Sequence, residues 1–140
     1  MSSLIQIPSL VESNITSYLS ALSAISYPVF QSFGISEYSL PCVLVKAGKF
    51  SQMEVNTGVF QGSLAVSVIS QIDDVSNVLN THDEIVGQSY EAMQDEGLNT
   101  AFNDNGQMWF INLDSIDQEK QDRALITILE YSIACQNLTI

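Results

Sequence analysis

The stretch QGSLAVSVISQIDDVSNVLN, residues 61–80, decides the fold. Its first half alternates apolar and small polar residues with a period of two, which is typical of a strand with one buried face. Asp73 and Asp74 end this strand, and Thr81 to Glu84 fits a capping box that opens a helix. The two carboxylates could belong to a binding or catalytic site, but local structure accounts for them. The stretch therefore predicts a strand, a corner and a helix.

Two helices are predicted. The first covers residues 8–24, where a capping box from Ser9 to Glu12 precedes apolar residues at helical spacing. The second begins at the capping box of residues 81–84. Its apolar face is formed by Ile85, Val86, Tyr90 and Met93. A short helical turn is expected at residues 98–102, followed by a β-turn at Asn105-Gly106.

Four strands are predicted. Besides the strand after Gly62, they cover residues 41–47, 107–117 and 123–135, with residues 48–60 as a long excursion and residues 117–122 as a polar turn. The last strand is apolar on both faces, so we expect its middle to be covered on both sides. The element order α-β-β-α-β-β predicts an α+β fold. It consists of one domain over residues 1–140, with a mainly antiparallel four-stranded sheet and two helices packed on it.

The charge of the chain excludes several partners. Four Lys and Arg residues stand against 16 Asp and Glu residues among 140, which gives a net charge of −12. Four cations cannot form the basic face that nucleic acid or an anionic membrane requires. The longest apolar run falls far short of the roughly 20 residues that span a bilayer, and the N-terminus lacks a positively charged leader. Cys42 and Cys135 lie in apolar runs, so we interpret them as buried thiols.

No motif predicts catalysis, a cofactor or a metal. His82 is the only histidine, and its place in the capping box explains it without a catalytic role. The NDNG stretch at residues 103–106 lacks the carboxylate that a calcium loop needs five residues before its glycine. Carboxylates at residues 114–119 are interpreted as a solvated hairpin turn. The sequence therefore assigns no catalytic, cofactor-binding or metal-ligating residue.

Several apolar residues are candidates for a contact with another chain instead. Five of them lie in or at the end of the excursion, and one lies on the strand at residues 107–117, on the face opposite Trp109. Exposed apolar residues on a long loop are unfavourable in a monomer, and aromatic residues are enriched at interfaces. The candidates are Phe50, Met53, Val55, Val59, Phe60 and Phe110.

Three segments together resemble the tail-terminator, or tail-completion, proteins of tailed bacteriophages. They are GSLAVSVISQIDDVSN, THDEIVGQSYEAMQDEGLNTAFN and ALITILEYSIAC. In that family a strand ends in an acidic or polar corner, a His-Asp pair opens the main helix, and a last strand ends near a cysteine or polar residue. Here the pair is His82-Asp83, the Leu-x-x-x-Phe step runs from Leu98 to Phe102, and the similarity covers residues 62–135.

The resemblance implies a structural virion protein without catalysis or cofactor. Such proteins form a ring, in that family a hexamer, that caps the tail tube and joins the tail to the head-side neck. The implied partners are further copies of the chain, the tube protein and the neck or connector proteins. DNA would pass through the lumen without specific binding, and assembly would take place in the host cytoplasm. By position, residues 48–60 match a loop that reaches a neighbouring subunit.

Two other functions stay open from the sequence. One is a different head–tail connector, such as a stopper or adaptor protein. The other is a small acidic domain that binds a cation or ligand at Asp73, Asp74 and residues 114–119.

Overall fold

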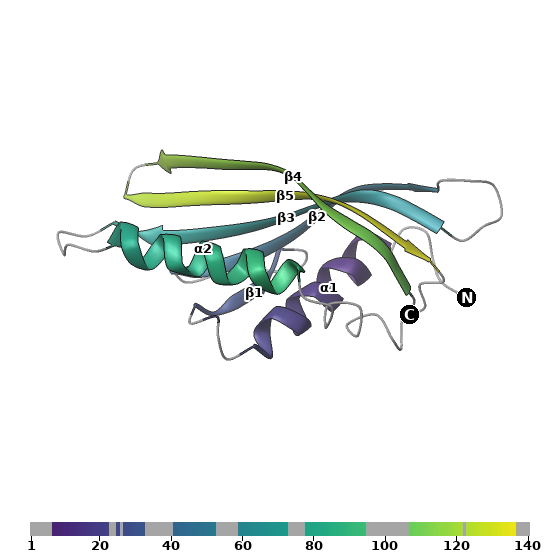
Figure 1. The fold of residues 1–140 in the computed structure, drawn as a ribbon, viewed down its shortest axis with the longest axis horizontal. Helices are drawn as coiled ribbons and strands as arrows, with labels where there is room; N and C mark the ends of the chain where they lie inside the picture. The colour runs from purple at the N-terminus through teal and green to yellow at the C-terminus, as the bar shows by residue number, and fades with distance from the viewer. Residues whose placement is uncertain are drawn as a thin grey trace.

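The computed structural model describes residues 7–22, 25, 27–32, 41–52, 59–72, 78–94, 107–121 and 123–136. Two helices and five strands follow one another along the chain, and Figure 1 shows their arrangement. The elements are α1 (Ile7–Ser20), β1 (Val29–Gln31), β2 (Cys42–Gln52), β3 (Val59–Gln71), α2 (Val78–Gln94), β4 (Gln107–Gln121) and β5 (Ala124–Gln136). The strands form one sheet in the order β1-β2-β3-β5-β4.

The sheet differs from the predicted one in an additional parallel strand. β1 pairs with β2 in parallel, with Val29 opposite Val43, whereas all other neighbouring strands are antiparallel. The prediction of a four-stranded antiparallel sheet in the order α-β-β-α-β-β was therefore wrong. The order is α-β-β-β-α-β-β, and the sheet is mixed. β1 has only three residues and directly follows Pro28, so it is too short to show the alternation from which a strand is predicted.

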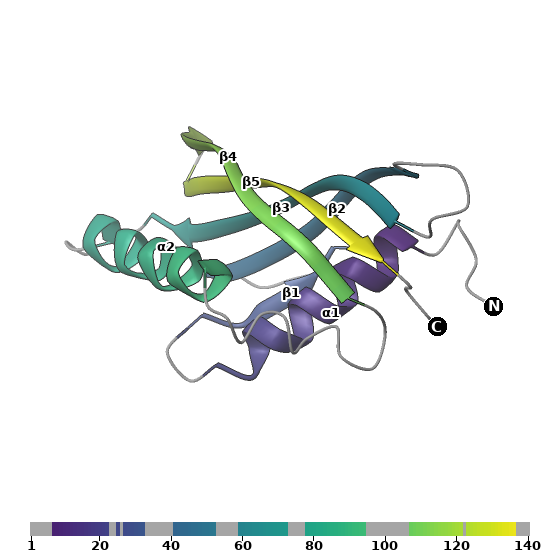
Figure 2. The ribbon, with the colours of Figure 1, turned by 45° about the vertical axis from the view of Figure 1, so that its right-hand side comes forward.

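Both helices pack against the same face of the sheet (Figures 1 and 2). This core face carries alternate residues of β3 and β5, among them the cross-strand pair Val66 and Leu129, and both residues are fully buried. The opposite face, which we call the open face, carries Ile126 and Ile128, both half-buried. The structure thus places the two helices on one side of β5, whereas we expected its middle to be covered on both sides.

The strands are longer than predicted. β2 and β3 continue through most of the expected excursion, with a register shift between Ala47 and Phe50. The Phe50 ring packs over Gly62, where an added Cβ would lie 2.5 Å from the ring atoms Cγ and Cδ1. The packing of the Phe50 ring therefore requires glycine at position 62, although in the sequence a glycine interrupts the pattern of a strand. β4 continues to Gln121, so the polar turn predicted at residues 117–122 was wrong as well.

The observed starts of the two helices show that both capping boxes were predicted at the wrong positions. α2 begins at Val78, so Thr81 lies inside the helix and does not cap it. α1 begins at Ile7 and ends at Ser20, four residues before the predicted end. The carboxylate of Glu12 reaches the sheet, where its Oε2 accepts a hydrogen bond from the backbone N–H of Ala47 on β2 at 2.8 Å.

The Glu12 contact completes one edge of the sheet. Along this edge, Val43 N–H donates to the Pro28 carbonyl at 2.8 Å, and the Val45 carbonyl accepts from Ser32 N–H at 2.9 Å. Ala47 N–H is the next donor on the same edge, beyond the end of β1, and Glu12 of α1 takes it. A buried backbone donor without a partner is costly, so this carboxylate stabilises both the edge and the position of α1.

The two cysteines are free and buried, which confirms that prediction. Cys42 lies opposite Ile69 on the open face, whereas Cys135 lies opposite Phe60 on the core face. About nine residues of β3 separate these positions, roughly 30 Å of strand, so the cysteines cannot form a disulfide with each other. Several other predictions lie outside the described residues: the helical turn at 98–102, Asn105-Gly106, and the corner at Asp73-Asp74.

Candidate functional site

A chain of hydrogen-bonded polar side chains crosses the core at the end where α2 begins. His82 of α2 is at its centre and is fully buried. Its Nδ1 lies 2.7 Å from Ser70 Oγ of β3, and its Nε2 lies 2.7 Å from Thr127 Oγ1 of β5. The chain continues on both sides, with Tyr27 Oη 2.9 Å from Ser70 Oγ and Gln118 Nε2 donating to Thr127 Oγ1 at 2.9 Å. This polar chain ties α2 to two strands of the sheet.

The Ser70–His82 pair resembles half of a nucleophilic triad in its distance alone. A nucleophile has to reach its substrate, but Ser70 is only 1% exposed and Thr127, on the other side of the ring, only 2%. Burial lowers the pKa of His82 below its ordinary value of 6.5, and the nearby Asp83 carboxylate opposes this effect. His82 is therefore neutral at physiological pH and bonds two hydroxyl groups. This geometry suits a structural connection better than a catalytic base.

The sequence contained a signal for this polar chain. Ser70 and Thr127 both occupy core-face positions in strands whose other core-face residues are largely apolar, and His82 lies one helical turn before the buried Ile85. Buried polar groups have to be hydrogen-bonded, so polar residues at three core positions predict that they meet. The interpretation of His82 as part of a capping box concealed this signal.

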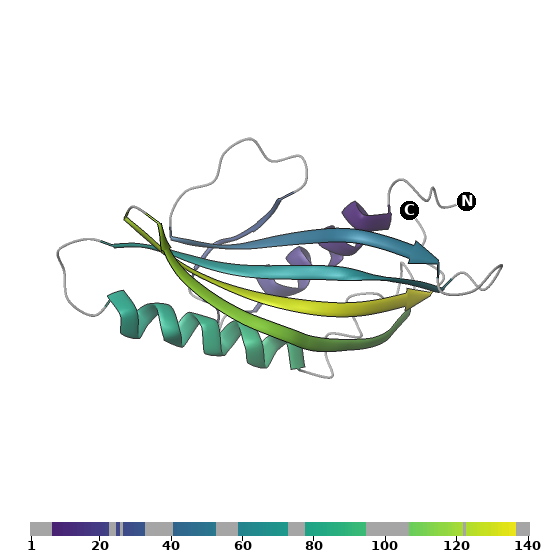
Figure 3. The same cartoon turned by 90° about the horizontal axis from the view of Figure 1, so that it is seen from above.

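The open face of the sheet carries a hollow of about 270 Å³. It spans the middle of the sheet, from β2 to β4. Its lining residues are Lys46, Gly48, Ser63, Leu64, Ala65, Asp114, Glu130 and Tyr131. The small residues form its floor, while one ammonium group and two carboxylates project from strands on either side. Figure 3 shows this four-strand surface from above.

Two serines orient the carboxylates of the hollow. Ser132 Oγ donates to Asp114 Oδ2, and Ser115 Oγ donates to Glu130 Oε2 at 3.2 Å. Asp114 lies at the second register shift of β4, between Leu113 and Ser115, and Ser115 is the cross-strand partner of Glu130. The bulge therefore brings the two acidic side chains to one side of the hollow. The hydroxyl groups hold them there.

The outer half of β4 pairs with β5 at the end of the sheet where α2 begins (Figures 1 and 3). Residues 114–121 of β4 are exposed on both faces, and Ile116, on the core-face side, is 60% exposed. Asp117 and Glu119, which we expected in a turn, lie on this strand. An extended strand does not wrap its carboxylates around an ion. Among the described residues, no group of three or more His, Cys, Asp or Glu is placed to hold a metal.

The candidate interface residues occupy different places. Phe50 and Phe60 are half-buried and pack against the core, and Val59 is buried. Phe110 lies half-buried on the open face, opposite Ala134 of β5. Met53 and Val55 are outside the described residues. The four described candidates do not share one surface, since Phe50 and Phe60 lie on the core face and Phe110 lies on the open face, and the role of the six residues at an interface stays a prediction.

Comparison with known proteins supports the fold. A chain from the virion of a native gene transfer agent (GTA) particle has a similar structure, with a TM-score of 0.61 and 10% sequence identity. The similarity covers 90% of this chain and 94% of that chain, so it includes the whole architecture. No protein-family model matches the sequence, and no curated protein is detectably similar to it. Within the described residues, no helix is long and apolar enough to cross a membrane.

Proposed function

We propose that this chain is a structural protein of a phage-like virion, and more specifically a tail terminator whose ring closes the end of the tail tube. The observation that carries the proposal is the shared fold with a chain of the GTA virion, which extends over nearly the full length of both chains. The resemblance of residues 62–135 to tail terminators points in the same direction. The ring would also join the tail to the neck proteins on the head side.

The described site supports assembly better than catalysis. The serine–histidine pair is enclosed in the core, while the β4 edge and the part of the open face around Lys46, Ser63 and Glu130 are accessible. Interfaces between subunits use such surfaces, because an unpaired strand or an open sheet face can be covered by a second chain. We therefore propose a protein without catalytic activity and without a cofactor.

The charge suits a ring around DNA. A net charge of −12 would make the wall of a lumen repel DNA, so that the DNA passes without adhering. The position of the charges in an assembled ring tests this idea directly. A strongly basic lumen in a reconstruction of the particle would contradict it.

Loss of the protein tests the specific role. A terminator stops the polymerisation of the tube, so particles made without it should carry tubes of abnormal and variable length in electron micrographs. A stopper or adaptor acts on the head side, so its loss should leave tubes of normal length that are detached from heads. Purified protein added to polymerising tube protein should shorten the tubes only if it is a terminator.

A cation-binding domain is the remaining alternative. It predicts a monomer whose melting temperature rises with added calcium, because a ligand that binds only the folded state stabilises it. A melting temperature that does not change at millimolar calcium, together with the tube phenotype above, would exclude this alternative.

A further inference from the structure

We propose that His82 is a latch that a proton operates. The neutral ring, protonated at Nδ1, holds the start of α2 on the sheet, and a second proton, at Nε2, releases it. The latch is the polar chain described above, which consists of Tyr27, Ser70, His82, Thr127 and Gln118. It does not depend on the proposed role in the virion, because it follows from the direction in which these hydrogen bonds run.

Gln118 sets the direction of the polar chain at its β4 end. The amide nitrogen of Gln118 only donates, and it donates to Thr127 Oγ1 at 2.9 Å. Thr127 is buried, so its own hydroxyl hydrogen needs an acceptor inside the protein. Among the described residues, the acceptor within reach of this hydroxyl is Nε2 of His82, at 2.7 Å. Nε2 is therefore unprotonated, and the neutral ring carries its hydrogen on Nδ1.

The other half of the polar chain fits the same direction. Nδ1–H of His82 donates to Ser70 Oγ, and the hydroxyl of the buried Ser70 donates to Tyr27 Oη. Tyr27 is half-buried, so its own hydrogen can reach solvent. In the opposite direction, Nε2–H would donate to Thr127, and the Thr127 hydrogen would be left without an acceptor in the core, which is costly.

A second proton on the ring disrupts this arrangement at Thr127. Nε2–H and the Gln118 amide would both donate to the Thr127 oxygen, and the hydrogen of this hydroxyl would lose its acceptor. The imidazolium would also be a buried charge with a hydroxyl group, and no carboxylate, bonded to each nitrogen. Both effects favour a state in which the ring leaves the core and reaches water.

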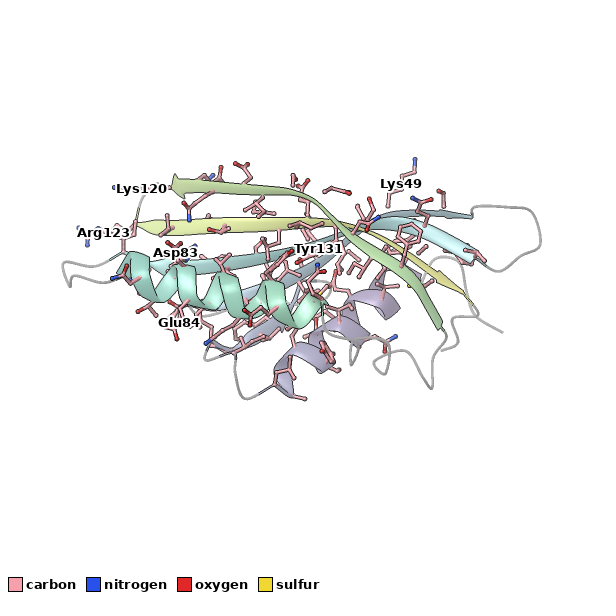
Figure 4. All side chains as sticks on the ribbon, viewed as in Figure 1. Lys49, Asp83, Glu84, Lys120, Arg123 and Tyr131 are labelled. Atoms are coloured by element: carbon pink, nitrogen blue, oxygen red, sulfur yellow. The ribbon has the colours of Figure 1, made fainter. Side chains whose placement is uncertain are left out.

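The charged groups around the ring do not compensate for its burial. Asp83, the next residue of α2, favours the protonated ring by its charge but is itself exposed. β3 carries no charged residue, and the single one of β5, Glu130, lies on the open face. Lys120 lies on the same side of β4 as Gln118, and its positive charge cannot pair with an imidazolium. Figure 4 shows Asp83 and Lys120 at this end of the molecule, where the other charged residues of the described elements are Glu84, Asp117, Glu119 and Arg123, all exposed.

The two halves of α2 are held in different ways. Farther along the helix, Ile85 and Met93 are buried, and Tyr18 Oη of α1 donates to the Ala92 carbonyl at 3.3 Å. At the start of the helix, the described residues are tied to β3 and β5 through the two hydrogen bonds of His82. Protonation should therefore loosen the first turns of α2 while the second half stays in place.

Nitrogen NMR of the ring tests the tautomer, and the signals need no assignment because the chain has a single histidine. At about pH 8, where an imidazole is neutral, a long-range proton–nitrogen correlation of the full chain should show Nδ1 protonated and Nε2 unprotonated. Gln118→Glu should reverse this pattern, because a carboxylate only accepts and would take the Thr127 hydrogen. Thr127 would then accept from Nε2–H, and Ser70 would donate to Nδ1.

Two control variants separate the reversal from a change of charge or contact. Gln121→Glu makes the same substitution further along β4, at an exposed position outside the polar chain. Gln118→Met removes the amide without supplying an acceptor. Both controls should keep the hydrogen on Nδ1, because Thr127 still needs Nε2 as its acceptor. Urea unfolding establishes that each variant is folded before its spectrum is recorded.

Hydrogen exchange followed by mass spectrometry tests the release of α2. After correction for the intrinsic pH dependence of exchange, protection of residues 80–86 relative to α1 should fall as the pH is lowered below 6.5. The fall should be at most about tenfold per pH unit, since one proton is taken up when the latch opens. In His82→Leu, which cannot take up this proton, the protection of residues 80–86 relative to α1 should not change over the same range.

Three results would overturn the proposal: a wild type with its hydrogen on Nε2, a Gln118→Glu variant with the same tautomer as its controls, or protection of residues 80–86 that responds to acid equally in wild type and His82→Leu. None of them bears on tube length in particles, so the assignment to the tail is tested separately.

Discussion

Acid should destabilise this protein through His82, the only histidine of the chain. Burial lowers the pKa of the folded imidazole below the 6.5 of an exposed histidine. The unfolded chain therefore binds a proton at a pH where the folded chain does not. The stability that results from the neutral ring is complete above pH 6.5 and is lost as the pH falls below this value. The loss ends once the folded state is protonated as well.

The linkage relation sets the size of the effect. One proton of difference between the two states changes the free energy of unfolding by at most about 1.4 kcal/mol per pH unit. Between about pH 6.5 and pH 5 the loss therefore cannot exceed about 2 kcal/mol. Domains have a total stability of only about 5–15 kcal/mol, so the change is measurable.

Urea unfolding of wild type and His82→Leu from about pH 8 to pH 5 isolates this contribution. The carboxylates titrate in both proteins, so the difference between the two curves reports the histidine. At the alkaline end the variant should be less stable by about 1–3 kcal/mol, because Ser70 and Thr127 each lose a buried partner. This gap should narrow as the pH falls from 6.5. A gap that is constant or widens towards the acidic end would refute the reasoning.

Three further predictions concern packing and burial. Gly62→Ala should lower the free energy of unfolding in urea by about 1–3 kcal/mol, because the added Cβ would overlap the Phe50 ring. Gly87→Ala adds its Cβ in open space on the exposed surface of α2, so it should be neutral or stabilise the protein by up to about 1 kcal/mol. Equal effects of the two substitutions would contradict this reasoning. Burial raises the pKa of Cys42 to about 11 and of Cys135 to about 12. Treated with an alkylating reagent at about pH 8, both thiols should therefore stay unmodified in mass spectrometry until the protein unfolds. Rapid labelling of the folded protein would refute their burial. Glu12→Ala should lower the free energy of unfolding by about 1–3 kcal/mol, while Glu12→Gln, which keeps an acceptor for the Ala47 N–H, should recover much of the loss; identical values for both variants would count against the contact.

The elements that the sequence predicted well are those with a strong period. β3 and β5 alternate between a buried and an exposed face, and the apolar positions of α1 recur at helical spacing. Their existence follows from local pattern alone. The start of α2 was misplaced because residues 81–84 satisfy the capping pattern while lying within the helix. A local motif of four residues does not decide a boundary when the apolar face extends further.

The missed features depend on distant parts of the chain. β1 (Val29–Gln31) forms because it pairs with the edge of β2 from Val43 onwards. A strand of three residues is too short to show an alternating pattern in the sequence. The outer half of β4 looks like a turn in sequence because an exposed ribbon is polar on both faces. The hollow combines Lys46 of β2 with Glu130 of β5, far apart in the chain, and only the sheet order β2-β3-β5-β4 brings them together.

The Glu12 carboxylate makes the two edges of the sheet different in their capacity to pair with a further strand. It accepts the hydrogen bond of the Ala47 N–H, which lies on the edge of β2 just beyond the end of β1. A strand from another chain therefore could not use this N–H for pairing. At the opposite border, β4 has no further strand beside it among the described residues. A partner that extends this sheet by strand pairing would therefore add on the β4 side. Because the donor at Ala47 is occupied, strand pairing between two copies would join β4 to β4, which is a self-complementary contact around a two-fold axis.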